Sequence, residues 1–406
     1  MNYFSHSVPS SLDTSNLYGK RTLARHLRYN LLMAQFKASF GAKGCYFASA
    51  SGRVEIIGNH TDHNGGSVIG ATVTSDMLCA FDYNRSGLVR VKGKGRNDVV
   101  FAVDDVDNVE PGSAGMIKGV LSYLKLNGYK IGGFDAVTES KIPSGAGLSS
   151  GAALQVLVAK IVDALYNDGT LSCQTLARAG QYAENVYFGK PCGLLDQGVI
   201  AVGGVVAMDF ADGFNYRKFD PVLTDFDLVL VNSGGSHAPL TALYAQIPED
   251  MKKVAELFGA QRLCEVVPQQ FYGDYDNVAK FVGVRQAKRA KHFFDECARV
   301  AQAEKALVEG NQAALVELIR QSGESSRKLL GNCAYDGHTQ IADALDYAYK
   351  ICPDCAARVH GGGFAGTILC VVPKQKTAKF VMDMTLVYGP DNVKKVGLRP
   401  SGACVL

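Results

Sequence analysis

Apolar residues at helical spacing follow a turn that is rich in glycine and serine. They recur at i, i+3, i+4 and i+7 after residue 153, which predicts a helix with one buried face. These residues are Leu154, Leu157, Val158, Ile161, Val162 and Leu165. Residues 134–140 alternate apolar and polar side chains, as a half-buried strand does. The segment 141–151 between them, KIPSGAGLSSG, therefore stands at a strand-to-helix junction.

This junction is a candidate anion site. Ser149 or Ser150 is placed to cap the helix, whose first N–H groups are free and whose dipole is positive at that end. Gly145 and Gly147 would let the backbone approach a phosphate closely. The same pattern also fits an ordinary capped helix after a flexible turn, so other segments must decide between the two interpretations.

The remaining patterns predict an α+β protein of two domains that meet at a cleft. The helices that we expect span residues 20–40, 116–125, 173–187, 284–309, 312–330 and 338–350. The strands that we expect span residues 45–48, 134–140, 202–210, 228–232 and 367–372, with a strand meander over residues 68–103. Composition shifts near residue 220, which favours domains of residues 1–215 and 216–406. Basic residues of helix 284–309 are expected on its solvated face: Arg285, Lys288, Arg289 and Lys291.

Composition and charge narrow the classes of function. The chain has 406 residues and a net charge of +3, too small for us to expect nucleic acid or an anionic membrane surface as a partner. We expect no secretory signal and no bilayer-spanning run, and eleven scattered cysteines favour a reducing cytoplasm. Cys352 and Cys355 form a lone C-x-x-C pair near His360, which without a second pair does not favour a metal site.

Two common nucleotide-binding motifs are excluded. Residues 361–366 have the spacing G-x-G-x-x-G, but a predicted strand follows them, whereas the dinucleotide fingerprint requires a helix. The chain contains no G-x-x-x-x-G-K-[ST], so it is not a P-loop protein. Residues 52–66 and 192–198 also combine polar side chains with glycine, which is typical of turns that present side chains to a ligand.

Residues 52–66, 143–153 and 361–366, in this order, resemble the three motifs of the GHMP kinases. Residues 52–66, together with 191–197, are most similar to the galactokinases. The resemblance implies a two-domain GHMP kinase fold with the active site in the cleft between the domains. Residues 1–215 would form a ribosomal-protein-S5-like domain that binds sugar and ATP, and residues 216–406 a ferredoxin-like α/β domain. It also implies ATP, Mg2+ and phosphoryl transfer to the anomeric hydroxyl of a sugar.

The resemblance assigns roles to single residues. Asp196 matches the catalytic carboxylate that accepts the sugar proton, and Arg53 matches the arginine that steadies developing charge beside it. The residues that match sugar contacts are Asn59, His60, Asp62, Gly193 and Tyr244. The residues that match the ATP loop are Pro143, Ser144, Gly145, Ala146, Gly147, Leu148, Ser149 and Ser150. Those that match magnesium ligands are Ser150 and Glu184.

The chain departs from the family pattern at several positions. Gly151 replaces the third serine of the loop, so one hydroxyl that can serve the metal is missing. Ser51 replaces a proline, which we expect to be mild. Met116 and Ser113 stand where many galactokinases carry aromatic residues near the adenine, so we expect nucleotide contacts to differ there.

The most informative departure is Asn59, where the galactokinases have a glutamate that binds the C6 hydroxyl of galactose. The asparagine amide can bind the same hydroxyl, which would leave galactose as the substrate. Alternatively, loss of the glutamate charge would admit a C6 carboxylate, as in galacturonate, with His63 as an added donor.

We therefore expect a galactokinase-like enzyme that converts galactose to galactose 1-phosphate. Two alternatives stay open: a kinase for a related sugar such as a uronic acid, and a non-catalytic sensor of sugar and ATP. The presence of both Asp196 and Arg53 favours a kinase over a sensor, and kinases for mevalonate or homoserine fit less well because they lack the His-x-Asp sugar segment. We expect a cytoplasmic monomer or weak homo-oligomer that binds sugar and ATP, and neither nucleic acid nor a membrane.

Overall fold

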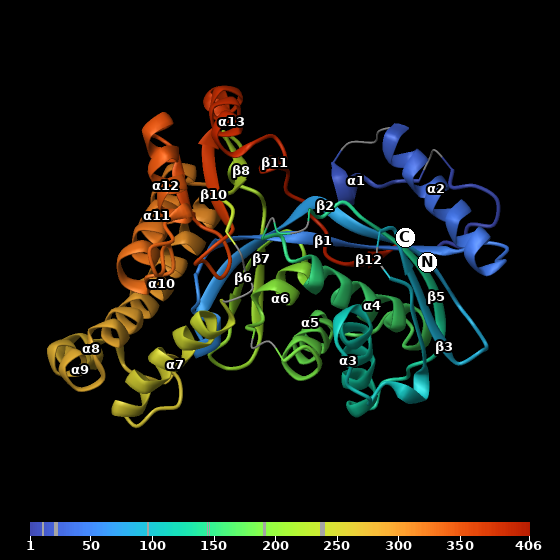
Figure 1. Cartoon of the computed structure of the whole chain (residues 1–406), viewed down its shortest axis with the longest axis horizontal. Helices are drawn as coiled ribbons and strands as arrows, with labels where there is room; N and C mark the ends of the chain where they lie inside the picture. The colour runs from blue at the N-terminus through green and yellow to red at the C-terminus, as the bar shows by residue number, and fades with distance from the viewer. Residues whose placement is uncertain are drawn as a thin grey trace.

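Two β-sheets of unequal size organise the chain (Figure 1). The computed structural model describes residues 1–9, 12–19, 23–95, 97–143, 145, 147–189, 192–235 and 240–406. The larger sheet has the strand order β12-β1-β2-β5-β3-β4, and β6 and β7 extend it from β2. The smaller sheet has the order β11-β8-β10-β9.

Two long antiparallel strands, β1 (Tyr46–Ile57) and β2 (Ser67–Tyr83), form the centre of the larger sheet. The others are β3 (Leu88–Gly93), β4 (Val99–Ala102), β5 (Phe134–Ser140), β6 (Val205–Asp209), β7 (Asn215–Phe219) and β12 (Cys404–Val405). β1 is buried along nearly its whole length because helices cover both faces of the sheet (Figure 1).

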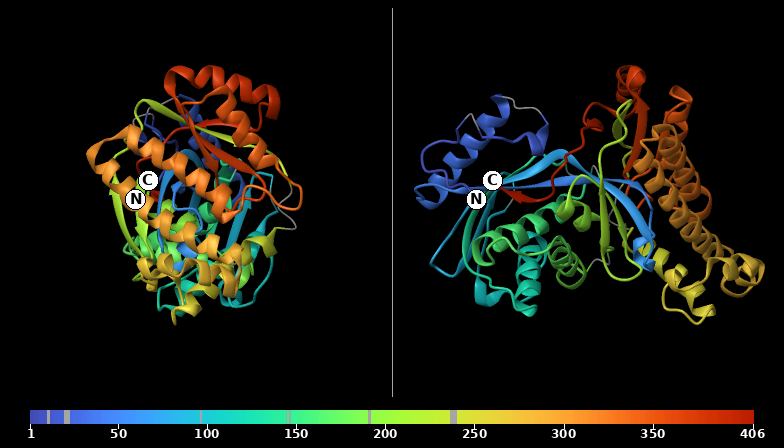
Figure 2. Two further views of the ribbon diagram at one scale, coloured as in Figure 1. Left: turned by 90° about the vertical axis from the view of Figure 1, so that its left-hand side faces the viewer. Right: turned by 180° about the vertical axis from the view of Figure 1, so that it is seen from behind.

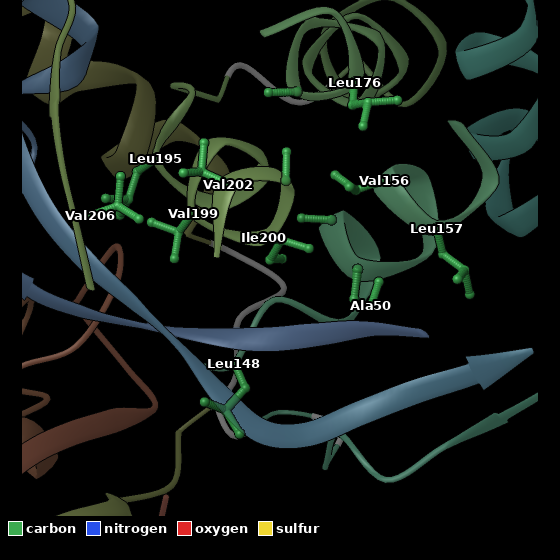
Figure 3. Packing of buried hydrophobic residues seen from close by; sticks show 14 of the residues in the cluster. Ala50, Leu148, Val156, Leu157, Leu176, Leu195, Val199, Ile200, Val202 and Val206 are labelled. Carbon is green, nitrogen blue, oxygen red and sulfur yellow. The ribbon is translucent and has the colours of Figure 1, made fainter. Parts of the chain in front are cut away.

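In the described part of the chain, α2 (Leu23–Phe40) packs on one face of the larger sheet, and a group of four helices lies on the other face (Figure 1). The four are α3 (Gly112–Leu126), α4 (Ser150–Tyr166), α5 (Cys173–Tyr182) and α6 (Leu195–Val202). Figure 3 shows Val156 of α4, Leu176 of α5 and Val199 of α6 in one apolar cluster beside β1. This core fixes the N-terminal ends of α4 and α6, which carry the glycine loop and Asp196.

The smaller sheet and its helices form the rest of the molecule, seen from two more sides in Figure 2. Its strands are β8 (Phe226–Asn232), β9 (Ala356–Val359), β10 (Thr367–Pro373) and β11 (Val393–Val396). The long helices beside it are α10 (Val284–Glu309), α11 (Gln312–Ser325), α12 (Gln340–Ile351) and α13 (Lys374–Tyr388). The short helix α1 (Ser15–Tyr18) precedes α2, and α7 (Thr241–Leu257), α8 (Pro268–Gly273) and α9 (Tyr275–Val282) precede α10.

The elements differ from the sequence-based expectation at several points. The expected strand 202–210 starts only at Val205, because the apolar run before it forms helix α6. The expected helices 173–187 and 312–330 each end in a π-helical segment, at Ala183–Tyr187 and Ser326–Leu330. Helices α7, α8, α9 and α13 were not expected. β1 continues well beyond the expected residue 48, so the first motif begins inside a strand.

The expectation that the basic residues of α10 face solvent is wrong for Arg289. Its side chain is buried and its guanidinium lies 2.7 Å from the carboxylate of Asp250, which is buried as well. Arg285 binds the same carboxylate. The charge of Arg289 is tolerated in the interior because Asp250 compensates it.

The ends of the chain lie together beside the larger sheet (Figure 1). The backbone N–H of Asn2 donates to the carbonyl of Leu406, and β12 pairs with β1. The division between residues 215 and 216 stays a prediction; β7 crosses it, and the C-terminal strand returns to the first sheet. In the described part of the chain, no helix is long and apolar enough to cross a membrane.

Candidate active site

A cavity of about 580 Å³ brings the motif segments together. Its walls include β1, the first turns of α4 and α6, the turn after β1 and the glycine run before β10. The first and the last of these segments lie more than three hundred positions apart in the sequence, so the cavity is made by the fold rather than by one local motif. Of the expected site residues, Ser144 and Ala146 lie outside the described part of the chain.

An arginine–aspartate pair lies in the cavity wall. Nε and Nη2 of Arg53, on β1, lie 2.8 Å and 2.7 Å from Oδ1 of Asp196, in the first turn of α6. Arg53 also donates to the carbonyl of Gly147, and the Ser149 hydroxyl donates to Oδ2 of Asp196. The pair predicted from the sequence is therefore formed, and both members contact the glycine loop.

Of the two expected capping residues, Ser149 and Ser150, Ser149 occupies the N-cap position of α4, but its side chain does not cap the helix. Ser149 has the left-handed conformation φ 58°, and its side chain makes no capping hydrogen bond because its hydroxyl binds Asp196. Helix α4 begins at Ser150, and its first backbone N–H groups lack intrahelical partners, as at any helix start. These N–H groups and the helix dipole favour an anion at this wall of the cavity.

The glycine loop packs closely on β1, and this close packing explains one glycine in each of them, Gly52 in β1 and Gly147 in the loop. A Cβ on Gly52 would lie 2.9 Å from the carbonyl oxygen of Leu148, and the N–H of Arg53 donates to the same oxygen at 3.2 Å. Gly147 has φ +69°, and a Cβ there would lie 2.9 Å from Nδ1 of His360. The glycine loop thus lies directly on β1 and against the end of β9.

His60 offers an acceptor to the cavity. Its Nε2 lies 2.9 Å from the carbonyl of Gly362, which can only accept, so Nε2 carries the hydrogen and Nδ1 has a free lone pair. Burial lowers the pKa of His60 to about 3, with smaller contributions from neighbouring charges, so the ring is neutral at pH 7. Its Nδ1 is buried and has no partner among the described residues, which suits a hydroxyl donor of a sugar.

Asp62 and Gly193 form one unit. The carboxylate of Asp62 accepts the N–H of His63 at 3.0 Å, and a Cβ on Gly193 would lie only 1.7 Å from its Oδ2. Only glycine at position 193 therefore allows the carboxylate to occupy this place. A carboxylate so held can bind two adjacent hydroxyls of a sugar.

The Asn59 amide is engaged by the protein on all sides. Its Nδ2 donates to Oε1 of Glu55 and to the carbonyl of Gly361, both at 2.9 Å. Its Oδ1 accepts from Asn332 at 2.9 Å and from Ser326 at 3.3 Å. The side chain is 1% exposed. The sugar contact expected of Asn59 stays a prediction, and the amide's own hydrogen-bonding capacity is already used.

Tyr244 packs on the glycine run of the third motif. Its ring lies against Gly362, where a Cβ would come within 2.5 Å of the ring, and its hydroxyl donates to Gly363 at 3.0 Å. Burial raises the pKa of Tyr244 to about 12, so the phenol stays neutral. This placement allows an apolar contact between the ring and a sugar.

Glu184 lies beside the start of α4, in the π-helical segment after α5. A Cβ on Gly151 would lie 3.4 Å from Oε1 of Glu184, and both residues line the cavity. Carboxylate and hydroxyl oxygens are ligands that Mg2+ accepts, so the side-chain chemistry of Glu184 and Ser150 fits the magnesium ligands expected from the sequence, which stay a prediction. In the described part of the chain, no group of three His, Cys, Asp or Glu side chains could hold a metal by itself.

The C-x-x-C pair has a structural place. Cys352 and Cys355 are buried in the core of the smaller sheet. Burial raises the pKa of the Cys355 thiol to about 12, and the neighbouring Cys352 adds to this, so the thiol is not poised to bind a metal.

Several cavity residues were not among the expected site residues. His360 and Thr367 flank the glycine run, and Phe188 presents a ring that is 44% exposed. Met116 also lines the cavity, so the cavity has an aromatic face from Phe188 although residue 116 is not aromatic. His360 and Thr367 directly precede and follow the third motif, a signal that could have indicated them, whereas nothing in the sequence around Phe188 places it at the site.

The chain is similar to known sugar kinases. A family profile described as "GHMP kinases N terminal domain" matches residues 115–204, and one described as "Galactokinase galactose-binding signature" matches residues 34–83. The galactokinase of Glaesserella parasuis is 30% identical over 360 residues, which cover 85% of this chain and 90% of that protein. The galactokinase of Actinobacillus pleuropneumoniae serotype 3 is 30% identical over 368 residues, with the same coverage.

Solved structures extend the similarity to the fold. The crystal structure of Lactococcus lactis galactokinase complexed with galactose matches with a TM-score of 0.83 at 26% identity, over 93% of this chain and 99% of that chain. Mevalonate kinase of Methanococcus jannaschii matches with a TM-score of 0.61 at 15% identity, over 87% of this chain and 98% of that chain, a likeness of fold alone. These structures confirm the expected two-domain α+β fold.

Proposed function

The chain belongs to the galactokinase family of the GHMP kinases, and we propose that it transfers the γ-phosphoryl group of ATP to the anomeric hydroxyl of galactose. The observation that supports this proposal is the Arg53–Asp196 pair, which contacts the glycine loop and lines the same cavity as the predicted sugar contacts. The product would be galactose 1-phosphate.

The residues of the chain divide the reaction between them. Asp196 accepts the proton of the anomeric hydroxyl as that oxygen attacks the γ-phosphorus. Arg53 holds the carboxylate and places positive charge beside the oxygens of the transferred group. The N–H groups at the start of α4 bind the remaining phosphate oxygens, which keeps the phosphorus in line with the attacking oxygen.

Magnesium belongs to this proposal as a cofactor. Glu184 and Ser150 would hold it at the first turn of α4, next to the phosphates, and the place of Gly151 beside Glu184 leaves room there. When bound, the ion supplies positive charge to the β- and γ-phosphate oxygens. The hydroxyl missing at residue 151 leaves Glu184 as the charged protein ligand of this proposal.

The charges of the cavity favour galactose over a uronic acid. Arg53 is the only lysine or arginine among its described lining residues, and it is bonded to Asp196. Asp62 places a carboxylate on the sugar side, and the ring of His60 is neutral. The carboxylate of a uronic acid would therefore add a second negative charge beside Asp62 and would lack a compensating cation.

The test is ADP release with a panel of galactose, galacturonate, glucose and mevalonate at saturating ATP and Mg2+. We expect galactose to give a kcat/KM at least about tenfold above every other compound. Galactose binding by calorimetry without any ADP release would instead indicate a sensor. A preference for galacturonate would overturn the choice of substrate and leave the kinase intact.

We also propose a cytoplasmic enzyme that acts as a monomer or weak homo-oligomer. All eleven cysteines are free thiols, and those in the core, such as Cys79 and Cys370, are packed as small apolar groups. Analytical ultracentrifugation with and without a reducing agent tests both statements, because a disulfide-linked or tightly dimeric species would contradict them.

A further inference from the structure

Two buried hydrogen-bond donors lie unused beside the glycine loop. His360 follows β9 directly and Thr367 begins β10; they are 3% and 2% exposed, and both line the cavity. Neither Nδ1 of His360 nor Oγ1 of Thr367 has a hydrogen-bond partner in the described part of the chain. Because a buried polar atom without a partner costs free energy, such atoms are rare in native proteins and call for a bound group.

The neighbours of His360 determine which ring nitrogen carries the hydrogen. The backbone N–H of Glu55 donates to Nε2 at 3.1 Å, so Nε2 is the acceptor and Nδ1 of the neutral ring is the donor. Burial, and then the cations Arg53 and Arg358, lower the pKa of His360 well below its ordinary value, so the ring is neutral at pH 7. His60 across the cavity has the opposite arrangement, with Nδ1 as acceptor.

Strand pairing directs the two side chains to the same place. The N–H of His360 donates to the carbonyl of Thr367 at 2.9 Å, which continues the antiparallel pairing of β9 with β10. Residues directly opposite each other on such strands present their side chains to one face. A Cβ on Gly147 would lie 2.9 Å from Nδ1 of His360 and 3.4 Å from Oγ1 of Thr367, so both donors reach the space beside this glycine.

We propose that His360 and Thr367 donate hydrogen bonds to the phosphoryl group that is transferred from ATP, an assignment that rests on the proposed kinase function. The terminal phosphate is the one that fits, because Arg53 joins Gly147 to Asp196, the residue that receives the sugar proton. As the sugar oxygen attacks, the bond from phosphorus to the ADP oxygen breaks and the sugar proton passes to Asp196. The two donors keep their hydrogens and stabilise the equatorial oxygens.

Matched substitutions separate the two nitrogens of His360. His360→Gln can still accept the Glu55 N–H with its side-chain oxygen, but it loses the Nδ1 donor. His360→Asn keeps an N–H group near the position of Nδ1. Thr367→Val has the same shape without the hydroxyl, and Thr367→Ser keeps the hydroxyl. We expect kcat to fall about 10²-fold or more in His360→Gln and Thr367→Val, and about threefold or less in Thr367→Ser, with KM for galactose nearly unchanged.

A second measurement does not depend on the sugar. The affinity for a non-hydrolysable ATP analogue is expected to fall about tenfold in His360→Gln and Thr367→Val, while the affinity for ADP stays as in the parent. A merely structural role would change both affinities or only the melting temperature. If the parent proves not to act on galactose, the proposed function fails, but this comparison of nucleotides still decides the role of the two donors.

The melting temperature of each variant is the folding control. Thr367→Val keeps a β-branched side chain in β10 and decides the matter if His360→Gln does not fold. The assignment is overturned if kcat and the affinity for the ATP analogue both stay within about threefold of the parent in Thr367→Val. It is also overturned if ADP and the analogue lose affinity equally.

Discussion

Replacing Asn59 by aspartate changes one atom and one charge, and it separates two roles for this residue. The Nδ2 group that donates to Glu55 and Gly361 becomes an oxygen, which can only accept. The new carboxylate would lie about 3 Å from the carboxylate of Glu55, inside the protein, and two hydrogen bonds would turn into contacts between acceptors. If residue 59 contacted the sugar instead, the same change would act on sugar affinity alone.

The size of the effect follows from the distances. Two unit charges about 3 Å apart repel by about 6 kcal/mol at an effective dielectric constant of 20. Arg358, which lies 2.5 Å from Oε1 of Glu55, offsets part of this. Alternatively, the two neighbouring carboxylates of the variant can share one proton and avoid the repulsion. Protonating a carboxyl with an ordinary pKa near 4 costs about 5 kcal/mol at pH 7.5 and about 2 kcal/mol at pH 5.5. The free energy of unfolding of Asn59→Asp is therefore expected to lie about 3–5 kcal/mol below that of the parent at pH 7.5.

The pH dependence has a definite sign. The folded variant holds a proton on the pair that the unfolded chain has released, so its deficit shrinks as the pH falls, by about 1.4 kcal/mol per pH unit at most. Asn59→Ala is the matched control: it loses the same hydrogen bonds and adds no charge, so its deficit is expected to stay constant between pH 7.5 and 5.5. Both deficits are differences from the parent at the same pH.

Urea unfolding followed by far-ultraviolet circular dichroism measures these differences, because the chain has no tryptophan. Galactose affinity by calorimetry is measured on the same samples. The reasoning is refuted if Asn59→Asp unfolds at the same urea concentration as the parent at both pH values while its affinity for galactose changes. That result would indicate that Asn59 contacts the sugar, as expected from the sequence.

Three further outcomes are expected. Asp196→Asn should fold like the parent and bind galactose, but lose about 10²–10⁴-fold in kcat because an amide accepts no proton; activity near that of the parent would remove the base assignment. Gly193→Ala should raise KM for galactose about tenfold or more with little effect on ADP affinity, since its Cβ would displace the Asp62 carboxylate; an unchanged KM would contradict this. Lowering the pH from 7.5 to 5 should reduce the free energy of unfolding by at most about 2 kcal/mol for each of His292 and His360, because burial lowers their pKa and the unfolded chain takes up protons below its pKa near 6.5. The loss should be smaller in His360→Gln, and a parent that is more stable at pH 5 would show that the sign is wrong.

The spacing of apolar residues was sufficient to predict the bounds of helices and strands that bury a single face. Helix α10 spans the expected residues, and so does β5, because helical spacing and alternation are each unambiguous there. Helix α6 was not expected, and the expected strand 202–210 overlaps it only at Val202, because a short apolar run that is buried all round shows no clear period. The charge of Arg289 on α10 gave no sign of burial, since its partner Asp250 lies on another helix.

The site itself was predictable only in part. The first motif indicated Arg53 and the galactokinase-like segment 191–197 indicated Asp196, and the two residues do meet. The hydrogen-bond partners of Asn59 could not be predicted from the sequence, because Ser326, Asn332 and Gly361 follow it by more than 250 positions. The hydrogen on His360 depends on the backbone of Glu55, which no spacing along the chain can reveal.

Helix α10, which lies beside the smaller sheet, holds Gly58 and Asn59, the residues that follow β1 directly. Glu296 of α10 accepts the backbone N–H of Gly58 at 2.9 Å, and His292 donates to the carbonyl of Asn59 at 2.9 Å. Burial favours the protonated form of Glu296, but the cations Arg299 and Arg358 and the hydrogen bond from Ser322 lower its pKa to about 2, so the acceptor persists at pH 7. Arg358 also binds Glu55, close to Arg53 on the same strand. The positions of the Arg53–Asp196 pair and of the predicted sugar contacts therefore both depend on the buried network of Glu55, Asn59, Glu296 and Arg358. Through this network, an uncharged residue at position 59 can govern sugar selection without touching the sugar.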